Sequence, residues 1–466
     1  MHQVSVSLAG TILATVALTG LTAAPALAST HGARGAGDRY FPLQGNGGYD
    51  VKHYDLRLRY DPASRHLRAR TIIRATAKKR LTSFDLDFRR NLRISTVTVN
   101  GVGAVFHQPA ALKQELVVRP FRAVAKDKTF TVVVRYAGTP AAITDPDGSV
   151  EGWVPTKDGA FVVGEPQGAP SWFPCNDTPR DKATYDFRVT VPRGVTAIAN
   201  GDLTGQTRKG RWTTFRWHNR EPMSTYLVTV TTGRFDVRTG TTPGGVPYYI
   251  ASDPKLTAKS SAVLAKLPAV TDYLAELYGP YPFSSTGAIV DDASKVGYAL
   301  ETQTKPVYDR PPDELTLAHE AAHMYFGDSV TFKRWRDIWI AEGFAEFSSW
   351  MWSEHTGGKT AQGFFDTYYK KKATSSVWKP PPGNPGSAAN LFSASVYLRG
   401  AMTLQALRVK LGDATFFDVL RSWHQTHRGR NVTVGQFRAF AEQRSGQDLS
   451  RFFDVWLVRK AKPTSW

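Results

Sequence analysis

Two histidines and a glutamate are spaced so that they could bind and use a metal ion. His319, Glu320 and His323 form the pattern HExxH, in a segment that Asp313 opens in the way helices start and that Gly327 closes. In a helix, His319 and His323 lie one turn apart on one face, so both imidazoles can reach one ion. Glu320 lies beside them, where its carboxylate can contact a water on that ion without being a ligand.

A third ligand is predicted from the next helix along the chain. Eighteen residues separate His323 from Glu342, a gap that fits a loop and the first turn of a helix running through Trp350 to Gly357. Two imidazoles and one carboxylate suit Zn²⁺ and leave a fourth position for water, which a catalytic site requires. We therefore expect His319, His323 and Glu342 to hold one zinc ion.

The elements that position these side chains change in character along the chain. From Tyr49 to about Gly240, short apolar–polar alternations are separated by turn clusters such as Asn100-Gly101, which is typical of antiparallel sheets. Beyond it, helical spacing begins at 257–278 and dominates to the end, with the last helices expected at 413–427, 433–445 and 448–459. The predicted fold class is multidomain α+β, with an antiparallel β domain at 48–240 and a mainly helical catalytic domain at 241–466.

The start of the chain predicts export. Residues 4–21 are mostly apolar and lead to Ala26-Leu27-Ala28, which is typical of a signal peptide cleaved after Ala28. Residues 29–47 are rich in glycine and polar residues and predict a flexible mature N-terminus. No later segment approaches the ~20 apolar residues of a membrane span. We expect a secreted protein with no stable membrane insertion after signal cleavage.

Composition and charge narrow the class of protein. Hydrophobic residues make up 41% of the 466, which excludes a disordered chain, and the single cysteine, Cys175, excludes an intramolecular disulfide framework. Lys and Arg number 59 against 40 Asp and Glu, a formal net charge of +19. The basic runs are short and no nucleic-acid module surrounds them, so no nucleic-acid partner is expected. We interpret the charge as favouring solubility, in preference to binding an anionic envelope polymer or an acidic substrate.

Several separated motifs resemble one family. HExxH, eighteen residues and then Glu342 within WxxEGFA, together with the segment Phe173–Pro179 (FPCNDTP), are similar to the gluzincin aminopeptidases, the group that includes aminopeptidase N and leukotriene hydrolase. The resemblance implies an N-terminal β domain followed by a thermolysin-like catalytic domain. It also implies a short form without the large C-terminal helical domain of longer members.

The same resemblance assigns further site residues. The family's Gly-Ala-Met-Glu-Asn motif falls on Tyr298–Thr302, which implies that Glu301 binds the substrate's α-ammonium group and that Ala299 lies in the substrate-binding edge strand. Tyr397, in a Tyr-x-x-Gly-Ala context, would donate a hydrogen bond to the developing oxyanion. A Gln or Glu from the β domain also joins the amine site, and Gln167 is the preferred match, with Glu165 as the alternative.

The expected function is a secreted, zinc-dependent aminopeptidase that acts on peptides with a free N-terminus, with Glu320 as general base. A thermolysin-like endopeptidase shares the zinc and the base and is the first alternative. Epoxide hydrolysis, and an inactive family member that binds envelope polymers, are the others. The preferred N-terminal residue and the oligomeric state are not predicted.

Overall fold

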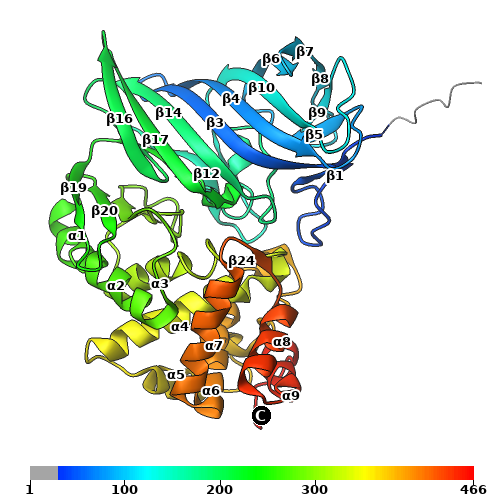
Figure 1. Ribbon diagram of the computed structural model, residues 1–466. Coiled ribbons are helices and arrows are strands. Elements are labelled where there is room, and N and C mark those ends of the chain that lie inside the picture. Colours follow the sequence, from blue (N-terminus) through cyan, green and yellow to red (C-terminus); the bar gives the residue numbers. More distant parts are fainter. Residues whose placement is uncertain (1–29, 466) are drawn as a thin grey trace, which may run out of the picture.

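Alternating apolar residues build a twisted eight-stranded sheet, which lies at the top of the molecule in Figure 1. The structure is a computed structural model that describes residues 30–465. On β3, Tyr54, Leu56 and Leu58 are buried while Arg57 points to the other face, as a strand period of two requires. Neighbouring strands are antiparallel except for β14 and β3, which are parallel. The spatial order is β16 (Asp202–Lys209), β17 (Trp212–Met223), β14 (Ala183–Pro192), β3 (Tyr49–Asp61), β4 (His66–Ala77), β10 (Thr129–Gly138), β6 (Arg93–Val99) and β7 (Val102–Gly103).

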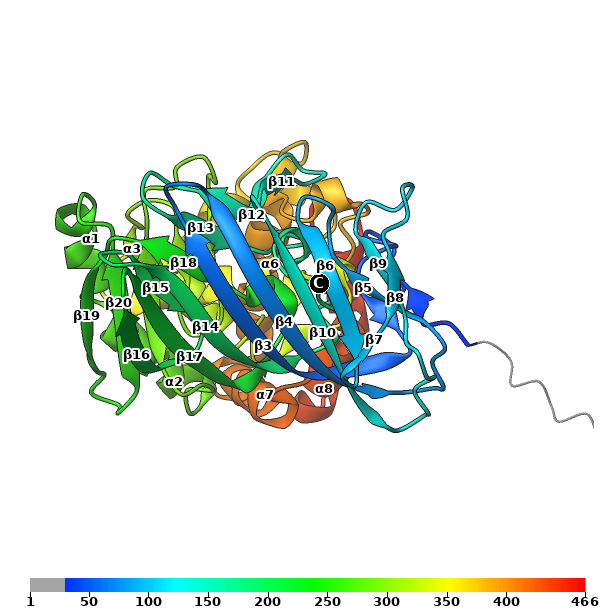
Figure 2. The same cartoon turned by 90° about the horizontal axis from the view of Figure 1, so that it is seen from above.

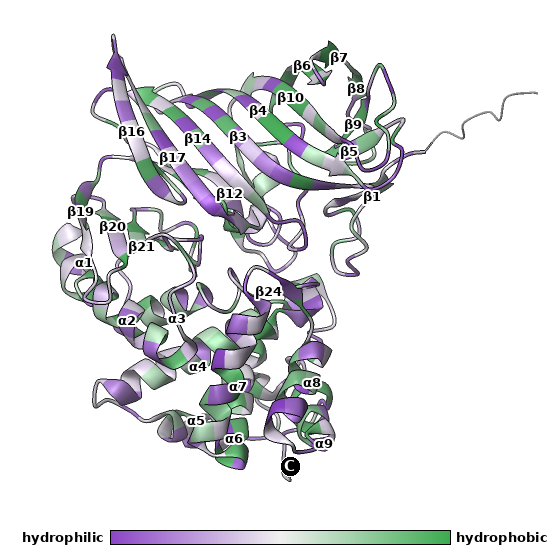
Figure 3. Cartoon of the chain, in the orientation of Figure 1, coloured by the Kyte–Doolittle hydropathy of each residue, from purple (hydrophilic) through white to green (hydrophobic). Residues whose placement is uncertain are grey.

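Smaller sheets complete the β domain. A three-stranded sheet contains β5 (Phe84–Asp87), β9 (Glu115–Arg119) and β8 (Val105–His107). A five-stranded sheet contains β11 (Ala142–Thr144), β12 (Val150–Pro155), β13 (Ala160–Val163), β18 (Val230–Gly233) and β15 (Thr196–Ala199). β12 lies on the side of the domain that faces the helices in Figure 1. In Figure 3, hydrophilic and hydrophobic residues alternate along the long strands of the large sheet, so one face of that sheet packs and the other meets solvent.

The signal peptide predicted at 1–28 lies outside the described residues. Residues 30–47 pack against the rest of the protein, which differs from the flexible segment expected at 29–47. β1 (Ala33–Arg34) pairs with β2 (Asn46–Gly47), and buried Gln44 accepts a hydrogen bond from the indole Nε1 of Trp335 in the other domain. The glycine-rich composition indicates only that this segment has no periodic apolar face. A few buried side chains are enough to fix the backbone conformation of the segment.

The second domain begins with a sheet, so it is not built from helices alone. The sheet has the order β19 (Asp236–Thr241), β20 (Pro247–Ser252), β21 (Thr286–Val290), β23 (Val307–Tyr308) and β22 (Ala299–Leu300). Because β19 pairs with β20, the boundary lies between Gly233 and Asp236 and not at the predicted residue 240. Within residues 30–465, β22 is an edge strand with a partner only on the β23 side.

Helices form the rest of the catalytic domain. They are α1 (Thr257–Leu264), α2 (Leu267–Tyr278), α3 (Glu314–His323), α4 (Trp339–His355), α5 (Ala361–Tyr369), α6 (Gly400–Leu411), α7 (Asp413–His427), α8 (Val434–Ser445) and α9 (Ser450–Phe453). The helix expected over 257–278 is two helices, because Pro268 at the start of α2 cannot donate a backbone hydrogen bond to a preceding turn. A short parallel pair, β24 (Thr331–Phe332) with β25 (Asn431–Val432), ties the loop after α3 to the segment before α8. Among the described residues, no helix is both long and apolar enough to cross a bilayer.

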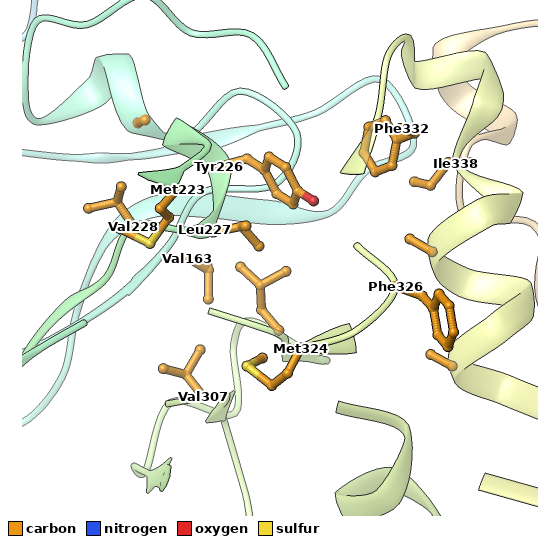
Figure 4. Packing of buried hydrophobic residues seen from close by; sticks show 14 of the residues in the cluster. Val163, Met223, Tyr226, Leu227, Val228, Val307, Met324, Phe326, Phe332 and Ile338 are labelled. Atoms are coloured by element: carbon orange, nitrogen blue, oxygen red, sulfur yellow. The ribbon is translucent and has the colours of Figure 1, made fainter. Parts of the chain in front are cut away.

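The two domains share an apolar core, shown in Figure 4. Its members from the β domain are Val163, Met223, Tyr226, Leu227 and Val228, and those from the catalytic domain include Val307, Met324, Phe326, Phe332 and Ile338. A partly buried lysine adds to this contact, because the Lys182 ammonium donates to the carbonyls of Asp328 and Ser329 at 2.8 and 3.0 Å. Seen from above in Figure 2, the large sheet covers much of the helical domain.

Candidate active site

The helix that carries the HExxH pattern starts at a capped turn. The Asp313 carboxylate accepts a hydrogen bond from the Thr316 amide at 2.7 Å, which satisfies one of the free N–H groups at the start of α3. One α-helical turn then separates His319 from His323, and their ring centroids lie 4.9 Å apart. Both rings therefore lie on the face of α3 that packs against α4.

Helix α4 brings the third ligand to these rings. The Glu342 Oε2 atom lies 3.3 Å from His319 Nε2 and 3.5 Å from His323 Nε2. Burial would raise the pKa of Glu342, but His323 and His319 outweigh it and lower the pKa to about 2. Burial would likewise lower the pKa of His323, but the carboxylates of Glu301 and Glu342 raise it to about 9.

Two glycines allow the helices to come this close. A Cβ added to Gly343 would lie 3.1 Å from the Gly400 Cα and 2.5 Å from the Trp339 Cδ1 atom, so α4 and α6 touch backbone to backbone. Tyr397 sits in a π-helical turn, residues 395–399, that leads into α6. Its ring stacks on His319, with centroids 5.9 Å apart and planes 25° apart. The glycine contact thus places Tyr397 beside the ligand triad.

Both ring nitrogens that face away from the triad have partners. His319 Nδ1 lies 3.3 Å from Glu346 Oε2, and His323 Nδ1 lies 3.1 Å from the Phe326 carbonyl oxygen. Such partners fix the ring orientation and tautomer of a metal-binding histidine. Glu346 lies one turn after Glu342 on α4. Sequence spacing allows it to be the partner of a ligand histidine, but the same spacing also fits a side chain on a solvated helix face.

Glu320 is buried next to the triad and is not one of its three members. Its Oε2 atom has no hydrogen-bond partner among the described residues. Burial raises the pKa of Glu320 to about 7, although His319 and His323 oppose the rise. A carboxylate with a free oxygen and a pKa near neutrality is suited to accept and return a proton.

A pair of buried carboxylates lies on the other side of the triad. Glu165, from the β domain, and Glu301, which follows β22, are 5% and 2% exposed, and the Oε1 atom of each lacks a partner in the described chain. One oxygen from each of Glu165, Glu301 and Glu342 lies within 4.8 Å of the others. Burial raises the pKa of Glu165 and of Glu301, and the two charges also repel. Two unpartnered acids at this distance suit a bound ammonium group, which would offset both charges.

The structure places Glu165 at this position, and not Gln167, the preferred match from the sequence. The Gln167 side-chain amide donates to Asp145, and its backbone N–H donates to Glu151 at 3.2 Å. Those buried acids hold Gln167 away from the cavity, whereas Glu165 lines it. Sequence spacing alone could not decide between two polar residues on one short turn.

The ligand triad, Glu320, Tyr397, Glu165 and Glu301 line one cavity of about 400 Å³, whereas Gln167 and Glu346 do not. Ala299 of the edge strand β22 lies on its wall, next to the open side of that strand. Tyr298 also lines the cavity, and its hydroxyl donates to the Val150 carbonyl of β12 at 3.1 Å. Further lining residues that sequence reasoning missed are Asp147, Ser149, Thr316 and Phe392. None of these four belongs to a motif, so the sequence contains no signal for them.

The donor set fits zinc. One ligand atom from each of His319, His323 and Glu342 lies within 4.8 Å of the other two, so a single ion can reach all three. Two nitrogens and one carboxylate oxygen are ligands that Zn²⁺ accepts, and they would leave a fourth position for water.

Comparisons with known proteins identify the family. Residues 50–227 match the Peptidase M1 N-terminal domain, and residues 297–456 match the Peptidase family M1 domain. The crystal structure of an M1 zinc metallopeptidase from Deinococcus radiodurans superposes with a TM-score of 0.83 at 30% identity, covering 92% of this chain and 99% of that one. The chain belongs to peptidase family M1. Zinc is the cofactor that this membership and the ligand triad assign to it.

Two further comparisons define the extent of the likeness. A two-domain M1 zinc metallopeptidase bound to L-tryptophan superposes with a TM-score of 0.84 at 29% identity, covering 92% of this chain and all of that one (100%). Glutamyl aminopeptidase of Bos taurus is 26% identical over 340 residues, 66% of this chain, and aminopeptidase N of Lactococcus lactis is 28% identical over 325 residues, 62% of this chain. The matched region spans 35% and 38% of those two relatives. This M1 chain thus spans little more than a third of the curated relatives it matches.

Proposed function

We propose that this chain is a secreted zinc aminopeptidase that releases the first residue from peptides with a free N-terminus. The observation that carries the proposal is the pair of buried, unpartnered carboxylates, Glu165 and Glu301, beside the ligand triad. A fixed pair of carboxyl groups that close to the reacting bond selects a substrate whose cationic amine is one residue away, because the ammonium offsets the charges of both. Export rests on the signal peptide expected at 1–28.

The chain's own residues divide the reaction between them. When bound at the triad, zinc supplies Lewis-acid polarisation of the scissile carbonyl and acidifies a water. Glu320 takes the water's proton on its free carboxylate oxygen and returns it to the leaving amine. The Tyr397 hydroxyl donates to the oxygen on which negative charge develops. Glu301 and Glu165 hold the ammonium, and the open edge of β22 at Ala299 aligns the peptide backbone.

A substrate panel tests this function. Aminoacyl chromogenic substrates are compared with their N-acetylated forms, each with and without a zinc chelator. We expect turnover only of the free-amine forms, lost with chelator and restored by zinc. Equal hydrolysis of acetylated substrates would instead show the endopeptidase alternative, and turnover that resists the chelator would refute the metal mechanism.

A further inference from the structure

A straight row of arginines crosses the outer face of the large sheet. In the strand registers, Arg216 of β17 is opposite Arg188 of β14, which is opposite Arg57 of β3. Arg57 is in turn opposite Arg70 of β4, and Arg70 is opposite Arg135 of β10. Five neighbouring strands therefore each contribute one arginine to a single line. At a strand spacing of about 4.8 Å, this line, the arginine row, spans about 19 Å.

Few acidic groups neutralise the arginine row. Arg57 pairs with Asp55 at 2.7 Å, and none of the other four has an ion-pair partner within residues 30–465. The other acids on this face are engaged elsewhere. Asp186 is paired with His53 and His218, Asp202 with Arg220, and Asp61 with Arg211. More cations flank the row, since Arg59 faces Arg68 one step along the strands and Arg74 lies on the other side, opposite His53.

The arginine row is open to solvent. Arg135 and Arg188 are exposed, and the other three members are partly exposed. Figure 2 looks down on the strands that carry the row, and no other element lies across them. The surface is broad and lacks a cavity among those found in the described chain, so it suits an extended ligand and not a small molecule.

Stability does not account for this arrangement. Like charges directly opposite one another on neighbouring strands destabilise a sheet. The row contains four such pairs in succession, and within the described residues its one ion-pair partner is Asp55. A feature that costs folding free energy and faces solvent is better explained by a partner that supplies the missing negative charge.

We propose that the arginine row binds a linear phosphodiester polymer of the cell envelope, a poly(polyol phosphate). Guanidinium groups pair with phosphate through parallel hydrogen bonds, and a line of them matches a chain of repeated charges. The envelope source follows from the export proposed above. Single-stranded nucleic acid fits less well, because its binding surfaces stack bases on free aromatic rings, and the Trp212 ring beside the row is already covered by Arg59 and Arg211, at 3.9 and 4.8 Å.

Binding of the full chain to purified poly(glycerol phosphate) tests the proposal. The row variant carries Arg70→Gln, Arg135→Gln, Arg188→Gln and Arg216→Gln. A matched control removes the same charge from the catalytic domain at four exposed lysines without ion pairs in the described residues, through Lys259→Gln, Lys372→Gln, Lys410→Gln and Lys460→Gln. A third variant replaces the four row arginines with lysine. Melting temperature and peptidase activity report folding, and neither should fall in the row variant.

We expect the row variant to bind the polymer at least about tenfold more weakly at low salt, with the slope of log K against log[salt] reduced by about 3. The control should keep its affinity. The affinity of the lysine variant should lie between those of the row variant and the control, because lysine keeps the charge and cannot form the two parallel hydrogen bonds of a guanidinium. Equal losses in the row variant and the control would overturn the proposal, as would no binding by the native chain. Affinity for single-stranded DNA equal to or above that for the polymer would show a nucleic-acid surface instead.

Discussion

At the scale of single residues, Glu320 should separate metal binding from turnover. Its carboxylate lies beside the triad and has a free oxygen, so Glu320→Gln removes the proton acceptor and keeps all three ligands. We expect kcat to fall by about 10²–10⁴-fold with one zinc per chain retained. Steady-state kinetics and metal analysis on the same sample measure both quantities. Unchanged kcat would rule out Glu320 as the base.

The amine site makes a second prediction at this scale. Glu301→Gln and Glu165→Gln each remove one charge that would pair with the ammonium, so kcat/KM for free-amine substrates should fall by about 10- to 100-fold. Gln167→Ala serves as the control, because that side chain contacts Asp145 and not the cavity, and its kcat/KM should change little. If Gln167→Ala had the larger effect, the placement of the amine at Glu165 would be wrong.

Zinc affinity should depend on pH through His323. In the metal-free protein the pKa of His323 is about 9, so the ring is protonated at neutral pH and must lose that proton to bind zinc. Affinity should therefore rise as pH increases towards 9, by about tenfold per unit for each proton released. Calorimetry in two buffers of different ionisation enthalpy counts the protons. A proton count of zero at pH 7 would contradict this prediction.

At the scale of elements, the contact between α4 and α6 sets the position of Tyr397. Gly343→Ala would drive a methyl group against Gly400 and Trp339, which should cost about 1–3 kcal/mol of unfolding free energy and lower kcat by moving Tyr397. Gly103→Ala, where an added Cβ meets nothing within 4 Å, is the matched control. Denaturant unfolding measures the first effect and kinetics the second. Equal stability of the two variants would show that the helices can separate without cost.

The ligand-bearing helices could be predicted because their spacing is local. His319 and His323 lie within one turn, and Glu342 follows after a gap that fits a loop and the first turn of a helix. Glu165 could not be distinguished in the same way, because the choice between it and Gln167 depends on Asp145 and Glu151, which capture Gln167 from a neighbouring strand and turn. Pairing partners far along the chain also decide that β19 joins the second sheet.

At the scale of the whole molecule, both domains build the cavity, since Glu165 comes from one and Glu301 from the other. A free amino acid should therefore stabilise the two domains together. At 100 times its Kd we expect about 2.7 kcal/mol of added stability, seen as one shifted transition in calorimetry, whereas the N-acetylated amino acid should have no effect. A shift of the catalytic domain alone would contradict this shared role.

The arginine row lies on the face of the large sheet opposite its buried apolar residues such as Leu56 and Leu58, and Figure 1 shows that sheet above the helical domain. An enzyme that binds a wall polymer through the arginine row would keep the catalytic domain, with its ligand triad, on the side away from the polymer. Immobilisation and turnover would then not compete for the same surface, so a wall-bound population could digest passing peptides at the rate of the free form.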